Sequence, residues 1–186
     1  MIFKKRKKTL QEKFPQYKIG RDTYGNPKIH SWGEGASLEI GSFTSIASGV
    51  QLFLGGEHRV DWVTTFPFNK LWSDAKEISG HPKTKGNIRI GNDVWIATEA
   101  IVMSGVTIGD GAVIGARTVI TKDVPPYSIV VGNPGSVVKK RFDDSTIQKL
   151  LDIEWWNWND SKIKKALPLL LNNEIDSFIT FAQNNG

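Results

Sequence analysis

Aliphatic residues recur every sixth position through residues 88–131. They stand at Ile90, Ile96, Val102, Ile108, Ile114 and Ile120. A period of six fits neither an α-helix, which repeats every 3.6 residues, nor a single strand, which alternates every two. It predicts a coil built of short flat sides, one hexapeptide per side, which is a parallel β-helix. The alternative, an ordinary sheet of Val/Ile-rich strands, predicts alternation and Asn-Gly or Asp-Gly hairpins instead.

Small residues accompany this pattern and indicate where the coil turns. A small or turn-compatible residue follows most of the aliphatic ones: Gly91, Ala97, Gly109, Gly115 and Thr121, with Met103 as the exception. Each side would place one aliphatic side chain inward, stacked on its counterpart in the next coil. The coils would lie about 4.8 Å apart, as neighbouring strands do. Glycine at a corner permits backbone angles that other residues resist.

A second, shorter block of sixes precedes the first and is separated from it by a break in the register. Its aliphatic residues are Ile40, Ile46 and Leu52, and the register blurs further upstream. The distance from Leu52 to Ile90 is not a multiple of six, which predicts an inserted loop over about residues 55–86. This segment is rich in aromatic residues. Long loops on a rigid scaffold usually bind a ligand or pack on a neighbour.

The two ends of the chain do not follow the repeat. Residues 1–18 predict a short polar or helical lead-in, and the repeat weakens after Ile120. Beyond residue 142 the pattern becomes helical, with Asp144 or Ser145 and then Asp160 or Ser161 as helix caps. We therefore expect a mainly β domain over residues 1–142 and a helical extension over residues 143–186.

Composition narrows the class of protein. The 186 residues include no cysteine, which excludes disulfides, a thiolate nucleophile and thiolate metal ligands. No apolar run approaches the roughly 20 residues of a membrane span, and no apolar segment follows the basic N-terminus, so we expect a cytoplasmic protein without a secretory signal.

The net charge of +5 equals the charge of the basic cluster at residues 4–8. That cluster is either a solvated arm or an attraction for an anionic partner. Nucleic-acid binding is not predicted, because no recognition motif accompanies it.

The three histidines are the candidate acid–base residues: His30, His58 and His81. A neutral imidazole, with a reference pKa of about 6.5, suits the removal of a proton from a hydroxyl group at cellular pH. His58 lies at the edge of the predicted insertion, whereas His30 and His81 have no comparable context. The plainer interpretation of His58 is a surface histidine hydrogen-bonded to Asp61.

Several motifs resemble one family of enzymes. They are DTYGNPKI, LEIGSFTSIASGV, GGEHRVDWVTTFPF, the hexads from IGNDVWIATEA to GNPGSVVKKRF, and the tryptophan-rich tail, over roughly residues 20 to 180. The chain resembles the hexapeptide-repeat acyltransferases of the xenobiotic acetyltransferase branch, and the pattern GGxHRxDWVTTxPF is specific to that branch. The branch includes type B chloramphenicol and streptogramin acetyltransferases and related saccharide O-acetyltransferases. Glu57 and Ala97 depart from the family pattern, where Asn and Gly respectively are common.

The resemblance implies properties that the repeat alone does not give. These are a left-handed coil, a homotrimer with sites between subunits, and acetyl-CoA as the acetyl donor. His58 resembles the catalytic base of the family. We expect direct attack by the acceptor hydroxyl, because the chain has no cysteine and no activated-serine motif for a covalent intermediate.

Further site residues follow from the matching motifs. For the cofactor they are Trp95, Ala97, Thr98, Ala116, Thr121, Lys122 and Lys139, with Lys139 toward the CoA phosphates. Ser104 is a candidate for stabilising the oxyanion. For the acceptor they are Tyr24, Asp61 and Trp62. Ala116, Thr121 and Ser104 fit equally well as ordinary coil residues, and both lysines as solvated ones.

The sequence therefore predicts an acetyl-CoA-dependent O-acetyltransferase that acts on a small hydroxyl acceptor, with a saccharide favoured. Inactivation of an antibiotic of the streptogramin A or chloramphenicol type is the alternative. A zinc enzyme of the carbonic anhydrase type also uses such a coil, but the histidines here are scattered and no metal site is predicted. A non-catalytic scaffold would leave the insertion and its histidine unexplained.

Overall fold

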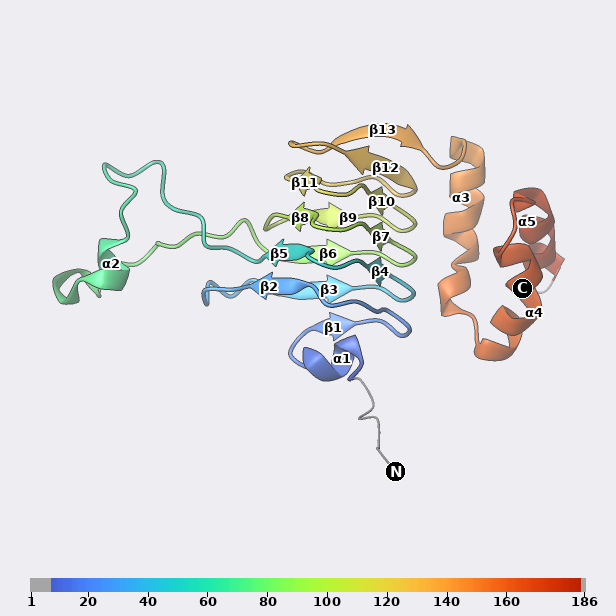
Figure 1. The fold of residues 1–186 in the computed structure, drawn as a ribbon, viewed down its shortest axis with the longest axis horizontal. Helices are drawn as coiled ribbons and strands as arrows, with labels where there is room; N and C mark the ends of the chain where they lie inside the picture. The colour runs from blue at the N-terminus through green and yellow to red at the C-terminus, as the bar shows by residue number, and fades with distance from the viewer. Residues whose placement is uncertain (1–7, 185–186) are drawn as a thin grey trace, which may run out of the picture. The chain divides into compact units, whose positions relative to one another are not determined.

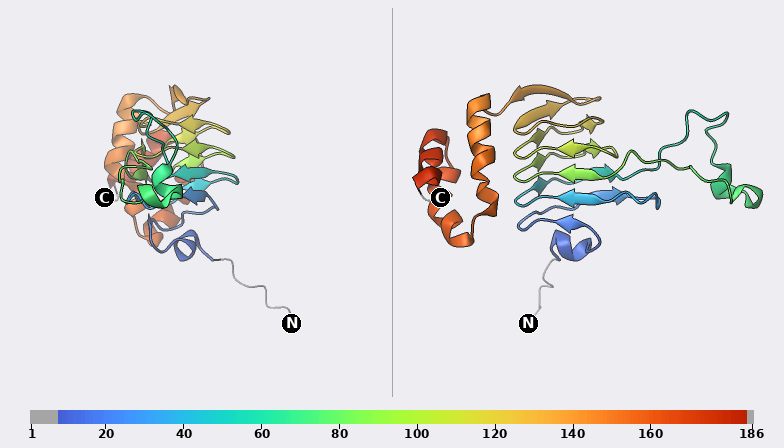
Figure 2. Two further views of the ribbon diagram at one scale, coloured as in Figure 1. Left: turned by 90° about the vertical axis from the view of Figure 1, so that its left-hand side faces the viewer. Right: turned by 180° about the vertical axis from the view of Figure 1, so that it is seen from behind.

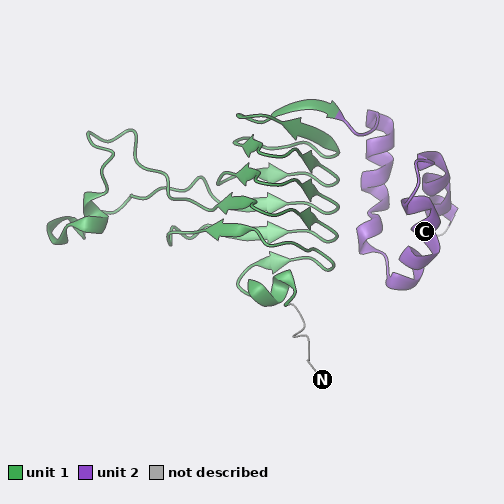
Figure 3. Ribbon diagram, viewed as in Figure 1, with its two compact units in different colours: residues 1–139 green, residues 140–186 purple. Residues whose placement is uncertain are grey.

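The computed structural model describes residues 8–184. The basic cluster predicted at residues 4–8 therefore lies, apart from Lys8, outside the described residues. The chain divides into two compact units, residues 1–139 and residues 140–186, which Figure 3 colours separately. Each unit is described by itself.

Unit 1 is a stack of short strands in three sheets (Figure 1). The first sheet, in spatial order, holds β1 (Lys18–Ile19), β3 (Leu38–Ile40), β6 (Ile88–Ile90) and β9 (Thr107–Ile108). The second holds β13 (Ser136–Lys140), β12 (Ser128–Val131), β10 (Val113–Ile114), β7 (Trp95–Ile96) and β4 (Ser45–Ile46). The third holds β11 (Val119–Ile120), β8 (Ile101–Val102), β5 (Gln51–Phe53) and β2 (Lys28–His30).

Successive strands of the chain visit the three sheets in turn, so three hexapeptides make one coil. Ile90 pairs in parallel with Ile40 on one side and with Ile108 on the other. The Gly91 amide donates to the Ile108 carbonyl at 2.8 Å, and the Gly41 amide donates to the Ile90 carbonyl at the same distance. The aliphatic residues of both blocks of sixes are buried. The prediction of a mainly β fold with parallel sheets is thus confirmed.

Side chains also stack at the corner between the first and second sheets. Asp110 Oδ1 accepts a hydrogen bond from the Asn92 amide at 2.7 Å, and Asn92 Oδ1 accepts one from the Ser42 amide at 2.8 Å. A Cβ atom at Gly91 would lie 2.6 Å from Asp110 Oδ1. This corner therefore needs glycine because the next coil passes too close for any side chain.

A long segment separates β5 from β6. Asn92 and Asp110, in successive coils at one corner, are 18 residues apart, whereas Ser42 and Asn92, which also lie in successive coils, are 50 apart. The extra residues leave the stack after β5 and return to β6 (Figures 1 and 2), and they contain only α2 (Phe68–Leu71) and the 3₁₀ turn η1 (Ser73–Ala75). We call residues 54–87 the insertion. Many of its apolar side chains are exposed: Val60, Val63, Phe66, Phe68, Leu71, Trp72 and Ile78.

A short helix, α1 (Leu10–Lys13), precedes the first coil. The Thr9 hydroxyl accepts from the Glu12 amide, and the Glu12 carboxylate accepts from the Thr9 amide, which makes a capping box. Leu10 is buried and joins the aliphatic core of the coil. The helix therefore covers apolar residues at the first coil, beside β1.

Unit 2 is helical. It comprises α3 (Asp144–Ile153), the 3₁₀ turn η2 (Trp155–Asn157), α4 (Asp160–Leu170) and α5 (Ile175–Asn184). The caps differ from those predicted by one residue each. Asp143 accepts from the Thr146 amide at 2.9 Å, which holds the pKa of its carboxyl at about 2, and Asn159 accepts from the Lys162 amide at 2.9 Å. In both cases the acceptor stands three residues before the amide it caps, and the predicted residues lie inside the helices.

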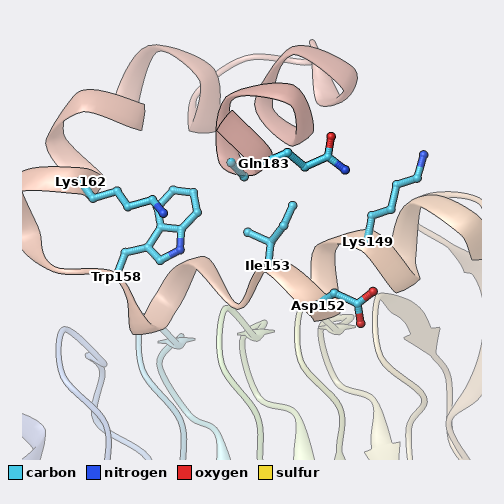
Figure 4. A pocket seen from close by; sticks show the side chains of 7 residues that line it. Lys149, Asp152, Ile153, Trp158, Lys162 and Gln183 are labelled. Atoms are coloured by element: carbon cyan, nitrogen blue, oxygen red, sulfur yellow. The ribbon is translucent and has the colours of Figure 1, made fainter. Parts of the chain in front are cut away.

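Unit 2 also holds a groove of about 300 Å³ (Figure 4). Ile153 and Trp158 form its apolar floor, and Lys162 Nζ lies 4.1 Å from the centroid of a Trp158 ring. It contains none of the predicted site residues. No helix within residues 8–184 is long and apolar enough to cross a membrane.

Truncating one stacked aliphatic residue should destabilise the coil. We expect Ile108→Ala to lower the free energy of unfolding by about 2–5 kcal/mol, because Ile108 is buried between two coils and the cavity cannot collapse easily. Urea denaturation of the variant and of Thr107→Ala, the exposed neighbour on the same strand, makes the comparison. Equal stability of the two variants would contradict the stacked core.

Candidate active site

The two ends of the insertion are joined where they leave the coil. The Glu57 amide donates to the Lys83 carbonyl at 3.0 Å, and the Lys83 amide donates to the Glu57 carbonyl at 2.7 Å. His58 follows Glu57 directly, and His81 precedes Lys83 by two residues. This antiparallel pair therefore brings the two histidines together across the root of the insertion.

Side chains fasten the same root to the coil. The Ser104 hydroxyl donates to Glu57 Oε1 at 2.5 Å and accepts from the Lys85 amide at 3.1 Å. The Thr84 hydroxyl donates to the Leu54 carbonyl at 2.7 Å. Ser104 is buried at the corner between β8 and β9, one coil along from the root. Glu57, one of the two residues that depart from the expected pattern, thus anchors the insertion to the coil.

His58 is exposed, and its tautomer follows from its contacts. Its Nδ1 lies 2.7 Å from the Thr65 carbonyl oxygen. A carbonyl only accepts, so in the neutral imidazole Nδ1 carries the proton and Nε2 carries the free lone pair. A general base needs this arrangement, with one nitrogen holding the ring and the other ready to accept.

His58 lies at the surface, but Asp61 is not its partner, so that part of the plainer interpretation is wrong. Arg59 instead binds both oxygens of Asp61, at 2.7 and 2.6 Å. This bidentate pair lowers the pKa of the Asp61 carboxyl to about 2. The Arg59 guanidinium also lies 5.0 Å from a ring centroid of Trp62. Asp61 and Trp62, both predicted for the acceptor, thus lie together near His58 and are linked by Arg59.

His81 is a residue of this cluster that the sequence did not single out. Its side chain is 7% exposed, and its ring centroid lies 4.6 Å from that of His58 with the planes at 80°. Burial lowers the pKa of His81, and the charges of His58 and Lys70 lower it further. One feature of the sequence could have indicated that His81 lies near His58. Residues 58 and 81 stand just inside the two ends of the predicted loop, and these ends must meet at the coil.

The predicted cofactor residues occupy two different corners of the coil. Thr121 and Lys122 follow β11, at the corner where Ser104 and the insertion also lie. Ala97, Thr98 and Ala116 lie after β7 and β10, at the corner between the second and third sheets; there the Ala97 amide donates to the Ile114 carbonyl. The third sheet separates these two groups within one subunit.

The remaining predicted residues lie on the second sheet. Trp95 is 53% exposed on β7, where it pairs with Ser45, and Ser45 bridges in turn to Tyr24. Tyr24 also lines a hollow of about 620 Å³ beside α1. Lys139 is exposed on β13. Among residues 8–184, no hydrogen bond or ring contact joins Tyr24 or Trp95 to His58.

The site has no cluster of metal ligands among residues 8–184, where no group of three or more His, Cys, Asp or Glu side chains could hold an ion. A parallel coil with an exposed, oriented imidazole at the root of its insertion is the observed arrangement. The family model "Bacterial transferase hexapeptide (six repeats)" matches residues 87–122. The fold and this match define a hexapeptide-repeat transferase.

Comparison with individual proteins shows which transferases this chain is similar to. A chloramphenicol acetyltransferase of Klebsiella aerogenes is 44% identical over 191 residues, which cover 93% of this chain and 90% of that protein. A virginiamycin A acetyltransferase of Staphylococcus aureus is 42% identical over 76% of this chain and 66% of that protein. The chain belongs to the xenobiotic acetyltransferase branch of the hexapeptide-repeat acyltransferases and is an acetyltransferase, as the motifs predicted.

A solved structure supports the fold assignment. A maltose O-acetyltransferase from Clostridium difficile 630 is 30% identical to this chain with a TM-score of 0.52. The alignment covers 67% of this chain and 59% of that chain, so less than two thirds of the structure is matched.

The contact between Glu57 and Ser104 should couple the insertion to the coil. We expect Ser104→Ala and Glu57→Ala each to lower stability, and the double variant to lose less than the sum of the two, with a coupling energy of about 0.5–3 kcal/mol. Urea denaturation supplies the cycle, and limited proteolysis reports cleavage within residues 54–87. Strict additivity would show that the hydrogen bond is not an anchor.

Proposed function

We propose that this acetyltransferase transfers the acetyl group of acetyl-CoA to a hydroxyl group of a small acceptor, with a saccharide as the favoured class, and that His58 is the general base. The observation that carries the role of His58 is the hydrogen bond from its Nδ1 to the Thr65 carbonyl, which leaves Nε2 as the proton acceptor. The titration range of imidazole suits the task at cellular pH.

The proposed reaction is direct transfer within a ternary complex. Nε2 of His58 removes the proton of the acceptor hydroxyl while that oxygen attacks the thioester carbonyl carbon. The tetrahedral intermediate collapses with cleavage of the carbon–sulfur bond, and the proton on His58 passes to the departing thiolate. Backbone amides at the coil corners are the proposed oxyanion donors. The Ser104 hydroxyl is a weaker candidate, because Glu57 and Lys85 occupy it.

We further propose a homotrimer of left-handed coils with each site between two subunits. The two corners that carry the predicted cofactor residues are separated by a sheet in one subunit. A second copy would set the corner with Ala97, Thr98 and Ala116 against the corner with Thr121 and Lys122. The exposed apolar side chains of the insertion support such packing, because monomeric proteins seldom expose that many together.

Acetyl-CoA would lie along this proposed groove. The backbone at Ala97 and Thr98, with Ala116 and Thr121, would line the pantetheine arm, and Trp95 would pack at its thioester end. Lys122 and Lys139 are exposed cations suited to the phosphates. Tyr24, Asp61 and Trp62 would form the acceptor side. The aromatic faces and the held carboxylate suit a sugar ring.

Residues 1–142 form the proposed catalytic domain and residues 143–186 a helical extension. The division between compact units at residues 139 and 140 and the cap at Asp143 support this boundary. A cytoplasmic location follows from the need for acetyl-CoA.

Antibiotic acetylation is the second candidate. The observation that favours it is the 44% identity to a chloramphenicol acetyltransferase over 93% of this chain. Two observations favour a saccharide instead. Glu57 departs from the pattern common in the antibiotic-inactivating enzymes, and residues 24–35 contain no feature typical of those enzymes. Measuring thiol release with chloramphenicol, a streptogramin A and a panel of sugars as acceptors separates the two candidates.

Removing the proposed base should abolish most turnover. We expect His58→Ala to lower kcat by about 10²–10⁴-fold, since general base catalysis contributes that much, while the affinity for acetyl-CoA changes little. The thiol-release assay measures kcat, and calorimetry measures acetyl-CoA binding. His30→Ala is the matched control, because His30 packs on Phe53 and contacts Gln51. Full turnover by His58→Ala would refute the assignment.

A further inference from the structure

His81 is a buried titratable residue that has no role in the proposed reaction. Its Nδ1 and Nε2 are both buried, and neither has a hydrogen-bond partner among residues 8–184. Buried polar atoms are normally paired, because leaving one unpaired costs stability. A phenyl ring would fill similar space without that cost. The ring of His81 therefore contributes through its packing and not through a hydrogen bond, and a phenyl ring should be able to replace it.

The surroundings of His81 fix it firmly. Its backbone carbonyl accepts from Asn69 Nδ2 at 2.9 Å, and Asn69 Nδ2 also contacts the Ile78 carbonyl at 3.0 Å. The Trp62 ring lies 6.4 Å from the His81 ring. Two residues after His81, Lys83 pairs with Glu57 and so joins the two ends of the insertion. The His81 ring is thus held in place beside the ring of His58.

Among residues 8–184, the His58 ring makes one hydrogen bond, at Nδ1, and the residue is exposed. The ring is tethered at Cβ, and this hydrogen bond opposes its turning about the Cβ–Cγ bond but does not prevent it, so Nε2 keeps some freedom of direction. Contact with a second surface at a steep angle removes that freedom, as edge-to-face ring pairs do. The His81 ring, at 4.6 Å and 80°, is that surface.

We propose that His81 is a positioning residue, whose ring packs against His58 and holds it in the orientation in which Nε2 faces the acceptor hydroxyl. This inference rests on the proposed role of His58. Because neither nitrogen of His81 has a partner, the ring acts through its shape and not through a hydrogen bond. Burial, followed by the charges of His58, Lys70 and Arg59, lowers the pKa of His81, which favours the neutral ring beside the imidazolium that forms on His58 during transfer.

The first test measures the His58 ring directly and needs no acceptor. In full-length protein labelled with ¹⁵N-histidine, His58 should show the Nδ1–H tautomer. His81→Ala should broaden these signals or mix the tautomers, and His81→Phe should restore them. His30→Phe is the matched control and should leave the His58 signals unchanged. Unchanged His58 signals in a folded His81→Ala variant would overturn the proposal.

The second test uses turnover with whichever acceptor the enzyme acetylates. A misplacement of about 1 Å can cost about 10²-fold in rate, so we expect His81→Ala to lower kcat by about 10–100-fold with an unchanged KM for acetyl-CoA. His81→Phe should recover most of kcat and unfold at a higher temperature. If His81→Phe is folded but as slow as His81→Ala, the nitrogens take part and the positioning role is wrong.

The two proposals fail in different ways. Full turnover by His58→Ala removes the proposed base, whatever the His81 variants do. Normal His58 spectra and normal kcat in His81→Ala remove the positioning role and leave the base intact. Should His81→Ala not fold, His81→Phe still decides the matter, through its His58 spectrum and its kcat.

Discussion

The hydrogen bonds between successive coils constrain everything else in this protein. The strand on each side of a coil is only two to five residues long, so its amides and carbonyls must find partners in the coils above and below. This fixes the repeat at six residues per side, because one slip would turn every inward aliphatic side chain outward. It also confines variation to the corners. The insertion and the proposed site lie at such a corner, where extra chain can leave and return without disturbing the register.

The repeat could be predicted from sequence because its period is local and uninterrupted. The stacked residues Ile90, Ile96 and Ile108 stand on inward positions of the sheets they were expected to form. The break in register also has definite ends, and from these the sequence predicts an insertion over about residues 55–86. His58 is predicted as the base because one branch-specific motif surrounds it. These are features that a short window of sequence contains.

Other parts of the site depend on contacts between distant residues, and no window of sequence contains them. His81 stands 23 positions from His58, and only the pairing of Glu57 with Lys83 brings the two rings together. The bond between Glu57 and Ser104 likewise joins residues 47 apart. The helix caps were misplaced for a local reason, since several adjacent residues could each cap, and the geometry chose Asp143 and Asn159.

The short helix α1 has a consequence for association between molecules. A coil of parallel strands ends in a layer of unpaired peptide groups and uncovered aliphatic residues, and such an edge is a template for stacking onto another molecule. Leu10 buries part of that layer, and the capping box at Thr9 and Glu12 makes the helix stable enough to stay there. We therefore expect this four-residue helix to disfavour end-to-end stacking of molecules, as terminal capping repeats do in other repeat proteins.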